Sequence, residues 1–435
     1  MSDFRTINFK NLLKSNSVLE NINYGKILLY SFAVSIYLPM IFTNIISIIL
    51  VVYCFFKFNK VGLKTVIKDK FVTLFLLFFL ILAFGFLYNI PVVGVFKGME
   101  KKLSFLVLPI TIGLIGIKRK DIEIIFMLFF YAGILVTTFA FFKVFLSPLE
   151  PLEFKNFINH ELSNKVGLHA TYLSMFLVLS LAYPLLYLKS LKNNNIKISI
   201  YCLSIVCVVY ILFLGVRIVW LTLVLLLILS GFYLIRKSVF SKKNIFIASI
   251  TVIIIPLLIF MVNPLRERLK EMVNYNNEYN TKEVWGGRGI RIMIWESGFQ
   301  LFKKQPLLGY GSSNAVQTEL ETVYKENNLG PLLYMMEKNG KTFNPHNQFL
   351  SEVLKHGILI GFYYPFVLIF LGKGYYENNS IVGFLFLLIT FGVSLTETIL
   401  ELNKGIVFFS FFASILYFSY KHNLNPKSSS RVGLE

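Results

Sequence analysis

Arginine is scarce in this chain, and its placement suggests phosphate binding. Of the 43 Lys and Arg residues only nine are Arg, and five of these lie at or beyond the predicted outer membrane face: Arg217, Arg266, Arg268, Arg288 and Arg291. A guanidinium offers a planar fork of donors that matches phosphate oxygens, which an ammonium does not. Arg266 and Arg268 are better explained as residues that flank a membrane end, which leaves the other three as candidates.

The segment GGRGIRIMIW (286–295) carries two of these candidates. Its glycines precede a helical pattern that runs to Lys304, and glycines at a helix start let backbone N–H groups converge on an anion. Arg288, Arg291 and Trp295 follow at i, i+3 and i+7, on one face. That face could hold a diphosphate with a sugar stacked on the Trp ring. The alternative is a surface helix with solvated arginines and a buried Trp.

The third candidate, Arg217, interrupts a long apolar run. It lies in GVRIVW (215–220) and is followed by Trp220, within the nearly uncharged stretch 198–235. Ionisable residues at membrane depth are costly and are candidates for function. The alternative is a short turn between two spans, where the Arg side chain extends to the lipid headgroups.

His346 is the candidate general base. It opens HNQFLSEVLKHGILIG (346–361), where a long polar loop re-enters the membrane, and it is followed by Asn347. Leu350 and Leu354 at i+4 and i+8 predict that the imidazole faces the start of an apolar helix. A neutral His near pH 7 suits the deprotonation of a sugar hydroxyl. The alternative is a helix-end His bonded to the backbone.

Two glutamates, Glu397 and Glu401, lie in SLTETILEL (394–402) at the outer end of a predicted span. A carboxylate at that depth needs a partner, which an outer-face Arg or His could supply. The alternative is a solvated rim.

A metal site is not expected. The three aspartates, Asp3, Asp69 and Asp121, are isolated and far apart, and a dedicated Mg²⁺ site usually needs paired carboxylates. Five scattered histidines without a carboxylate pattern do not form a metal site either. Of these, His169 and His356 are predicted to be structural.

The elements that must position these residues are membrane helices. The 435-residue chain is 56% hydrophobic and 15% charged, with mean hydropathy +0.66, whereas soluble domains carry about 25% charged residues. Spans of roughly 17–25 apolar residues predict an all-α polytopic protein of about twelve transmembrane helices. The predicted spans are 25–41, 43–57, 71–88, 103–117, 122–146, 166–188, 198–214, 217–235, 244–262, 347–371, 380–396 and 405–420.

The net charge of +20 is interpreted as a topology signal and not as a nucleic-acid footprint. Lysine-rich turns alternate with the glutamate-bearing loops 147–164 and 396–403, so both termini are predicted to be cytoplasmic. The organisation expected is a cytoplasmic N-terminal tail, about nine N-terminal spans, one long outer loop with short helices, about three C-terminal spans and a cytoplasmic tail. These parts occupy residues 1–24, 25–262, 263–345, 346–420 and 421–435.

The combination of motifs resembles the O-antigen ligase and O-antigen polymerase superfamily of lipid-linked oligosaccharide glycosyltransferases. Four pieces occur in order over roughly residues 200–410. They are Gly-x-Arg-x-x-Trp at 215–220, the Arg and Trp segment leading to PLLGYG (306–311), HNQFL…HGILIG at 346–361, and Thr396–Glu397. The family pattern has one arginine four before the tryptophan, here Arg291, so Arg288 is an extra neighbour. Where many relatives carry Glu, this chain has His356.

The resemblance implies a membrane-embedded (GT-C-like) glycosyltransferase of the bacterial inner membrane with its active site facing the periplasm. Its donor would be a glycan on undecaprenyl diphosphate and its acceptor lipid A-core or another glycan, with no cofactor and no metal. Arg217 and Arg291, helped by Arg288, would bind the diphosphate, and His346 would deprotonate the acceptor hydroxyl, giving inversion. Trp295, Asn347, Trp220 and Glu397 would contribute to substrate binding, and the apolar span faces would contact the polyprenyl chain and membrane lipids.

Two alternatives stay open from the sequence. A ligase moves a finished glycan and a polymerase joins lipid-linked repeat units, and the motifs favour the ligase only slightly. A lipid-linked sugar transporter would use the Arg and His residues as pathway groups, but transporters expect polar groups near the membrane midplane. Here the candidates cluster on one face around an outer loop of about 80 residues, far longer than most loops. The sequence does not indicate the oligomeric state.

Overall fold

The computed structural model describes residues 23–58, 60–84, 99–146, 153–188, 191, 193–236, 287–340 and 343–424, and all regular secondary structure in these ranges is helical. The predicted span 244–262 lies outside the described residues. The first half contains α2 (Tyr24–Ser35), α3 (Met40–Lys57), α4 (Lys60–Ile67), α5 (Lys70–Phe84), α7 (Ser104–Ile115), α8 (Arg119–Phe145), η1 (Phe154–Phe157), α9 (Asn159–Asn164), α10 (Ala170–Ser180), α11 (Ala182–Tyr187) and α12 (Asn194–Phe213). The second half contains α13 (Arg217–Arg236), α16 (Gly287–Lys304), α17 (Ser313–Glu326), α18 (Gly330–Asn339), α19 (Gln348–Gly361), α20 (Tyr363–Glu377), α21 (Ile381–Ser394) and α22 (Asn403–Leu424).

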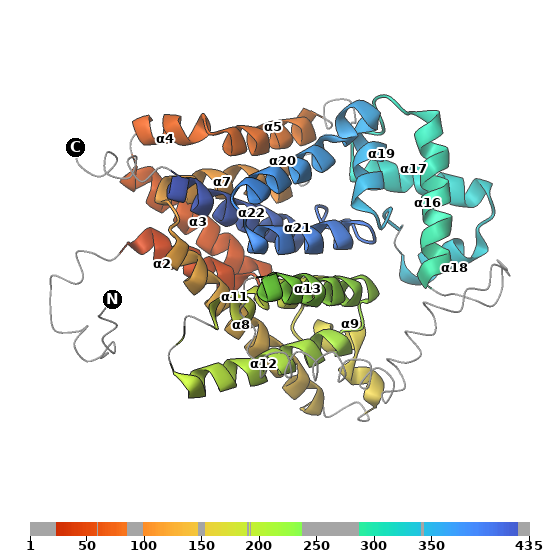
Figure 1. The fold of residues 1–435 in the computed structure, drawn as a ribbon. Coiled ribbons are helices and arrows are strands. Elements are labelled where there is room, and N and C mark those ends of the chain that lie inside the picture. The colour runs from red at the N-terminus through yellow and green to blue at the C-terminus, as the bar shows by residue number, and fades with distance from the viewer. Residues whose placement is uncertain are drawn as a thin grey trace.

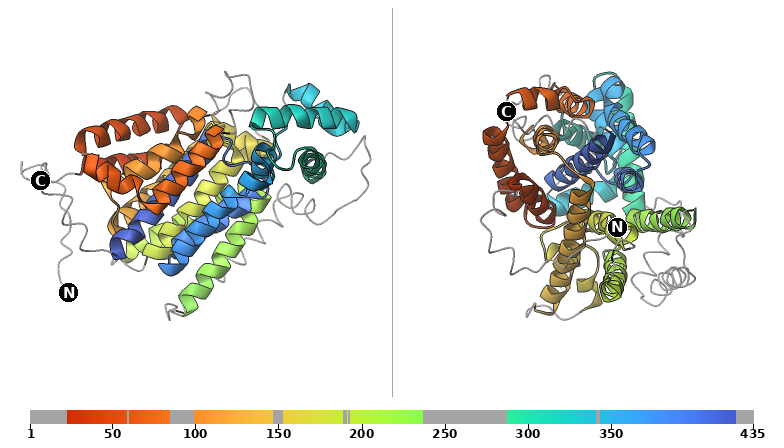
Figure 2. Two further views of the ribbon diagram at one scale, coloured as in Figure 1. Left: turned by 90° about the horizontal axis from the view of Figure 1, so that it is seen from above. Right: turned by 60° about the vertical axis from the view of Figure 1, so that its left-hand side comes forward.

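Most of these helices form one bundle around α10 and α22 (Figures 1 and 2). Every residue of α10 is buried, as is the run 405–416 of α22. The phenylalanines that dominate the composition fill this core. Phe408 stacks on Phe176 at 4.9 Å between ring centroids, and Phe412 lies 4.8 Å from Phe129. Aromatic packing of this kind joins α22 to α8 and α10.

Several helices have the length and composition of membrane spans. Among the described residues, three helices, α3, α8 and α12, are long and apolar enough to cross a membrane, and the bent pair α19–α20 adds a fourth if it counts as one span. The outward face of α3 carries exposed Ile48, Phe55 and Phe56, as expected for lipid contact. The total of about twelve spans remains a prediction.

The predicted spans 166–188 and 347–371 are not continuous helices. The predicted span 166–188 begins in the turn between α9 and α10. It then divides at Leu181, where α10 ends and α11 follows. In place of the span 347–371, α19 and α20 meet at an angle of 75°. Within α19, Gly357 has φ 67° and ψ 179°, a conformation that only glycine adopts readily.

The PLLGYG turn explains why α19 breaks there. Helix ends leave backbone carbonyls without intrahelical partners. The N–H of Tyr310 donates to the Leu354 carbonyl at 2.8 Å, and that of Gly311 donates to the Lys355 carbonyl at 2.6 Å. The turn at 306–311 therefore satisfies the carbonyls that the break exposes.

Two glycines make this close approach possible. A Cβ on Gly357 would lie 1.9 Å from the Leu307 carbonyl oxygen, and one on Gly309 would lie 2.6 Å from the Gly357 nitrogen. On the far side of the break, the Ile358 N–H donates to the Pro306 carbonyl at 2.8 Å. Side chains at either glycine would separate the turn from the helix.

The segment formed by α16, α17 and α18, called here the cap segment, lies at one end of the bundle, and α16 runs crosswise to the bundle helices (Figure 1). It has its own hydrophobic core, which includes Ile294, Leu320 and Tyr324 together with Leu354 of α19. The cap segment is thus packed on the broken helix, and helices occur within the predicted 263–345 loop.

Candidate active site

Glu397 joins two cationic or basic side chains from different parts of the chain. Arg291 Nη2, on α16, donates to Glu397 Oε1 at 2.8 Å, and His346 Nδ1 lies 3.2 Å from Glu397 Oε2. Glu397 itself lies in the loop between α21 and α22, called here the 395–402 loop. The structure therefore brings together three of the residues singled out in the sequence. It also supplies the Arg and His partners expected for Glu397.

The carboxylate is the most enclosed member of this cluster. The exposed side-chain fraction is 16% for Glu397, 28% for His346 and 35% for Arg291. Burial by itself would raise the pKa of Glu397, but the hydrogen bond and charge of His346 and the charge of Arg291 outweigh it and hold that pKa below its ordinary value. Glu397 is therefore ionised at neutral pH.

An ionised Glu397 determines the tautomer of His346. A carboxylate can only accept hydrogen bonds, so the imidazole must donate Nδ1–H to it. In the neutral imidazole this leaves the lone pair on Nε2. The arrangement can accept a proton at Nε2 while the carboxylate stabilises the resulting charge.

His346 is not on the face of a helix, which corrects the expectation from its spacing to Leu350 and Leu354. It precedes the N-cap of α19 and has φ +44°, so it lies outside the helix. Its N–H donates to Asn344 Oδ1 at 2.9 Å. Asn344 therefore helps to hold a conformation that L residues adopt infrequently.

Two predicted binding residues have clear roles in holding the 343–347 segment. Trp295 Nε1 donates to the Pro345 carbonyl at 3.0 Å, and the Trp ring packs against the core of the cap segment. Asn347 Oδ1 accepts the Leu350 N–H at 3.0 Å as the N-cap of α19, and its Nδ2 donates to the Leu395 carbonyl at 3.2 Å. Contact of either side chain with substrate remains a prediction.

Arg217 and Trp220 lie where α13 begins. Arg217 is the first residue of α13 and is half-buried, after a turn in which Gly215 has φ +64° and lies against the Asn159 side chain. Trp220 is buried, and its Nε1 donates to the Ile211 carbonyl of α12 at 3.2 Å. The structure shows a short turn between α12 and α13. The structure gives Trp220 a packing role, while phosphate binding by Arg217 remains a prediction.

The Arg217 end of α13 packs against the end of α21, which leads into the 395–402 loop. A Cβ on Gly392, near the end of α21, would lie 2.6 Å from Thr222 and 4.0 Å from Ile218.

Arg288 lies in the first turn of α16, three residues before Arg291, and its side chain lies outside the described part of the structure.

His169 is the N-cap of α10, where Nδ1 accepts the Thr171 N–H at 3.3 Å, and its ring lies 4.4 Å from that of His160. Among the described residues no group of three or more His, Cys, Asp or Glu side chains is arranged to hold a metal ion. Metal-free chemistry stays a prediction from the sequence.

Sequence reasoning missed a second polar cluster, which meets the same 395–402 loop at Glu401. Its other members are Lys102, Ser313, Gln348, Glu352 and Lys355. A signal was present, because Gln348, Glu352 and Lys355 recur at i, i+4 and i+7 on one face of a mostly apolar helix. Polar residues at that spacing in a membrane segment indicate a shared polar partner.

The helical bundle with apolar spans is that of a multi-pass membrane protein. Its polar clusters join α16 and α17 of the cap segment to the 395–402 loop. Residues 202–364 match the family model described as O-antigen ligase, which confirms the resemblance to the O-antigen ligase and polymerase superfamily. The match includes α13, the cap segment and α19, and thus Arg217, Arg291 and His346. It supports an O-antigen ligase- or polymerase-type function with a lipid-linked glycan and a glycan acceptor as substrates. No curated protein matches the sequence.

Proposed function

We propose that the protein is a ligase that transfers a glycan from undecaprenyl diphosphate to an acceptor hydroxyl of lipid A-core or a similar glycan. The reaction would take place at the periplasmic face of the bacterial inner membrane. The observation that carries the proposal is the His346–Glu397–Arg291 cluster, in which a histidine and an arginine share one largely enclosed carboxylate. The family match supports it, because the matched residues 202–364 include Arg291 and His346.

In this proposal His346 Nε2 takes the proton of the acceptor hydroxyl. The acceptor oxygen attacks the anomeric carbon, the new C–O bond forms, and the bond from that carbon to the diphosphate oxygen breaks, which inverts the anomeric configuration. Glu397 stabilises the imidazolium that forms. General-base catalysis of this kind contributes about 10²–10⁴-fold to rate.

Arg291 would stabilise the leaving diphosphate. One of its terminal nitrogens is bonded to Glu397, and a guanidinium has five N–H donors in all, so donors remain for phosphate oxygens. Arg217, at the start of α13, and Arg288, one turn before Arg291, are proposed to bind the same diphosphate. Preorganised donors aimed at developing negative charge supply most of the rate enhancement in many group-transfer reactions. Neither this scheme nor the sequence calls for a cofactor.

The sharing of Glu397 also has a positioning consequence. Because Arg291 and His346 bond to opposite oxygens of one carboxylate, the distance between phosphate-binding group and base is fixed by a rigid planar bridge. Holding reactants in such a geometry accounts for a large part of enzymatic acceleration.

The test is transfer by the purified protein in liposomes. The donor is lipid-linked glycan extracted from a strain that lacks the gene, the acceptor is lipid A-core, and neither nucleotide nor ion gradient is added. Glycosylated lipid A-core is the expected product. Scrambling of the donor across the bilayer without any glycan transfer would instead show a lipid-linked sugar transporter.

The lipopolysaccharide of the deletion strain separates ligase from polymerase, which use the same motifs. Bare core with accumulated long lipid-linked polymer is expected for the proposed ligase. Core bearing a single repeat unit would show a polymerase.

A further inference from the structure

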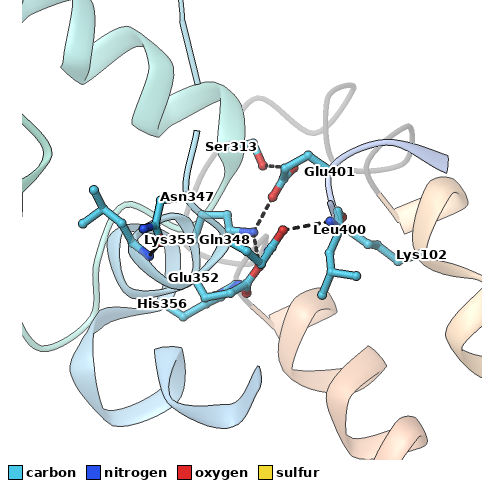
Figure 3. Close-up of polar contacts among 10 residues, drawn as sticks. Lys102, Ser313, Asn347, Gln348, Glu352, Lys355, His356, Leu400 and Glu401 are labelled. Carbon is cyan, nitrogen blue, oxygen red and sulfur yellow. Dashed lines mark hydrogen bonds and ion pairs between the residues drawn. The ribbon is translucent and has the colours of Figure 1, made fainter. Parts of the chain in front are cut away.

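A buried network of charged side chains contacts the same 395–402 loop as the candidate active site. Lys355 Nζ on α19 donates to Glu352 Oε1 at 2.6 Å and to Glu401 Oε1 at 2.5 Å, and lies between the two carboxylates (Figure 3). The exposed fraction of Lys355 is 3% and that of Glu352 is 1%. Lys355 therefore ties the broken helix to the 395–402 loop.

The same loop is held through its backbone. Gln348 Nε2 donates to Glu352 Oε1 at 2.6 Å, while Gln348 Oε1 accepts the Leu400 N–H at 2.8 Å. The Leu400 carbonyl accepts a hydrogen bond from Lys102. Both polar backbone groups of Leu400 are thus bonded to buried side chains. A buried amide group that lost these partners would carry a desolvation cost.

The 395–402 loop is held near both of its ends, by α19 and its N-cap and by the cap segment. Asn347 binds the Leu395 carbonyl at one end, and Lys355 binds Glu401 at the other. Ser313, at the start of α17 in the cap segment, donates to Glu401 Oε2 at 2.5 Å. Glu397 lies between these anchors, four residues before Glu401. The direction in which it presents its carboxylate therefore depends on them.

The charges in the network balance. Lys102 and Lys355 face Glu352 and Glu401, and His356 lies 3.7 Å from the second oxygen of Glu352. Burial would raise the pKa of Glu401, but Lys102, Lys355 and the hydrogen bond from Ser313 hold it below its ordinary value. Buried ion pairs are weak devices for stability but can fix one arrangement among several.

We infer that Lys355 is a positioning residue, and that through Glu401 it holds the 395–402 loop so that Glu397 meets His346 and Arg291. The inference rests on the proposed function, because the geometry that it protects is that of the transfer reaction. It assigns to the polar face of α19 a role that neither the family match nor the site motifs include. Misplacement of a catalytic group by about 1 Å can cost about 10²-fold in rate.

The decisive variant is the double substitution Glu352→Gln with Lys355→Met. It removes one charge of each sign, so the remaining pair of Lys102 and Glu401 stays balanced, while the bridge to the loop is lost. Lys355→Met alone leaves both carboxylates without this cation and serves as the harsher variant. The control is Lys26→Met, which breaks a partly buried ion pair with Asp121 between α2 and α8, at 2.8 Å.

Four quantities are measured on protein in liposomes: the kcat, the KM for donor, the unfolding temperature, and the hydrogen exchange of the 395–402 peptide. The Leu400 amide in that peptide is bonded to Gln348. The double variant should unfold near the temperature of the control and exchange 395–402 faster. Its kcat should fall about 10²-fold with a nearly unchanged KM. Lys355→Arg, which keeps the cation, should recover most of the kcat.

Two results for the double variant would overturn the inference. One is hydrogen exchange of 395–402 at the rate of the control, and the other is a kcat equal to that of the control despite faster exchange. Failure of the proposed function gives a different result, because the wild-type protein itself would then transfer no glycan. In that case the exchange rates still decide whether Lys355 holds the loop.

Discussion

His346 Nδ1 lies 3.2 Å from Glu397 Oε2, although the two residues are 51 positions apart in the chain. The contact joins the segment before α19 to the loop between α21 and α22, and Arg291 brings α16 to the same carboxylate. One glutamate therefore holds the cap segment, the broken helix and the end of the bundle in a single geometry. The predictions that follow depend on that geometry.

Arg291→Lys should reduce transfer although it keeps the positive charge. An ammonium can bond Glu397 or a phosphate oxygen, but it lacks the planar fork that serves both at once. We expect kcat to fall by about 10²-fold, as when one preorganised donor is lost. The assay is transfer in liposomes, with Arg119→Lys at the exposed start of α8 as the matched control. Equal rates for the two variants would contradict a bidentate role for Arg291.

Substitutions of Trp295 and Trp220 should differ in their effects on catalysis. Trp295→Phe removes the donor to the Pro345 carbonyl, beside His346, and Trp220→Phe removes the donor to the Ile211 carbonyl. Each loss should destabilise the protein by about 1 kcal/mol, measured by thermal unfolding in detergent. Only Trp295→Phe should also lower kcat, because only it loosens the segment that holds the base. A lower kcat in Trp220→Phe, together with a wild-type kcat in Trp295→Phe, would contradict this assignment.

Gly357→Ala should prevent the PLLGYG turn from docking. The added Cβ would lie 1.9 Å from the Leu307 carbonyl oxygen, at a backbone conformation that alanine avoids. We expect a loss of at least about 3 kcal/mol in the free energy of unfolding. Gly374→Ala on α20 is the control, because its Cβ would meet no atom within 4 Å. If both variants are equally stable, the break in α19 does not depend on this glycine.

Much of the site follows from the sequence, and the reasons for the remainder are physical. The scarcity of Arg identified Arg291, and the cost of a carboxylate at membrane depth predicted that Glu397 would have an Arg or His partner. The break at Gly357 was missed because a single glycine is tolerated within a helix. What forces φ positive there is the docking of the PLLGYG turn, about 50 positions earlier in the chain.

The buried network was missed for a related reason. Lys355 and Glu401 are 46 positions apart, and the partner of each is set by how α19 packs on the 395–402 loop. Within α19 the strong apolar pattern led to one continuous span in the prediction. The polar stripe of Gln348, Glu352 and Lys355 crosses that pattern on a different face, where only tertiary packing shows what it meets.

The stability supplied by Glu397 should depend on pH in a defined direction. His346, Arg291 and, at longer range, His169 face this carboxylate and hold its pKa below the ordinary value despite burial. Its contribution is therefore fully present above the unfolded-state pKa of about 4.3, and it is lost as pH falls through the lower folded-state pKa. The unfolding temperature of the wild type should exceed that of Glu397→Gln at pH 7, and the difference should shrink below pH about 4. A difference that grows on acidification would contradict the ionised bridge.

The central claim is that His346, oriented by Glu397, is the base for glycan transfer, and the most direct measurement is single-turnover transfer by His346→Ala. Wild type and variant are compared in liposomes with the same lipid-linked donor and lipid A-core acceptor, after both are shown to fold and to bind the donor equally. We expect the variant to bind donor but to transfer the glycan at least about 10²-fold more slowly. Transfer by His346→Ala at the wild-type rate would contradict the assignment of His346 as the base.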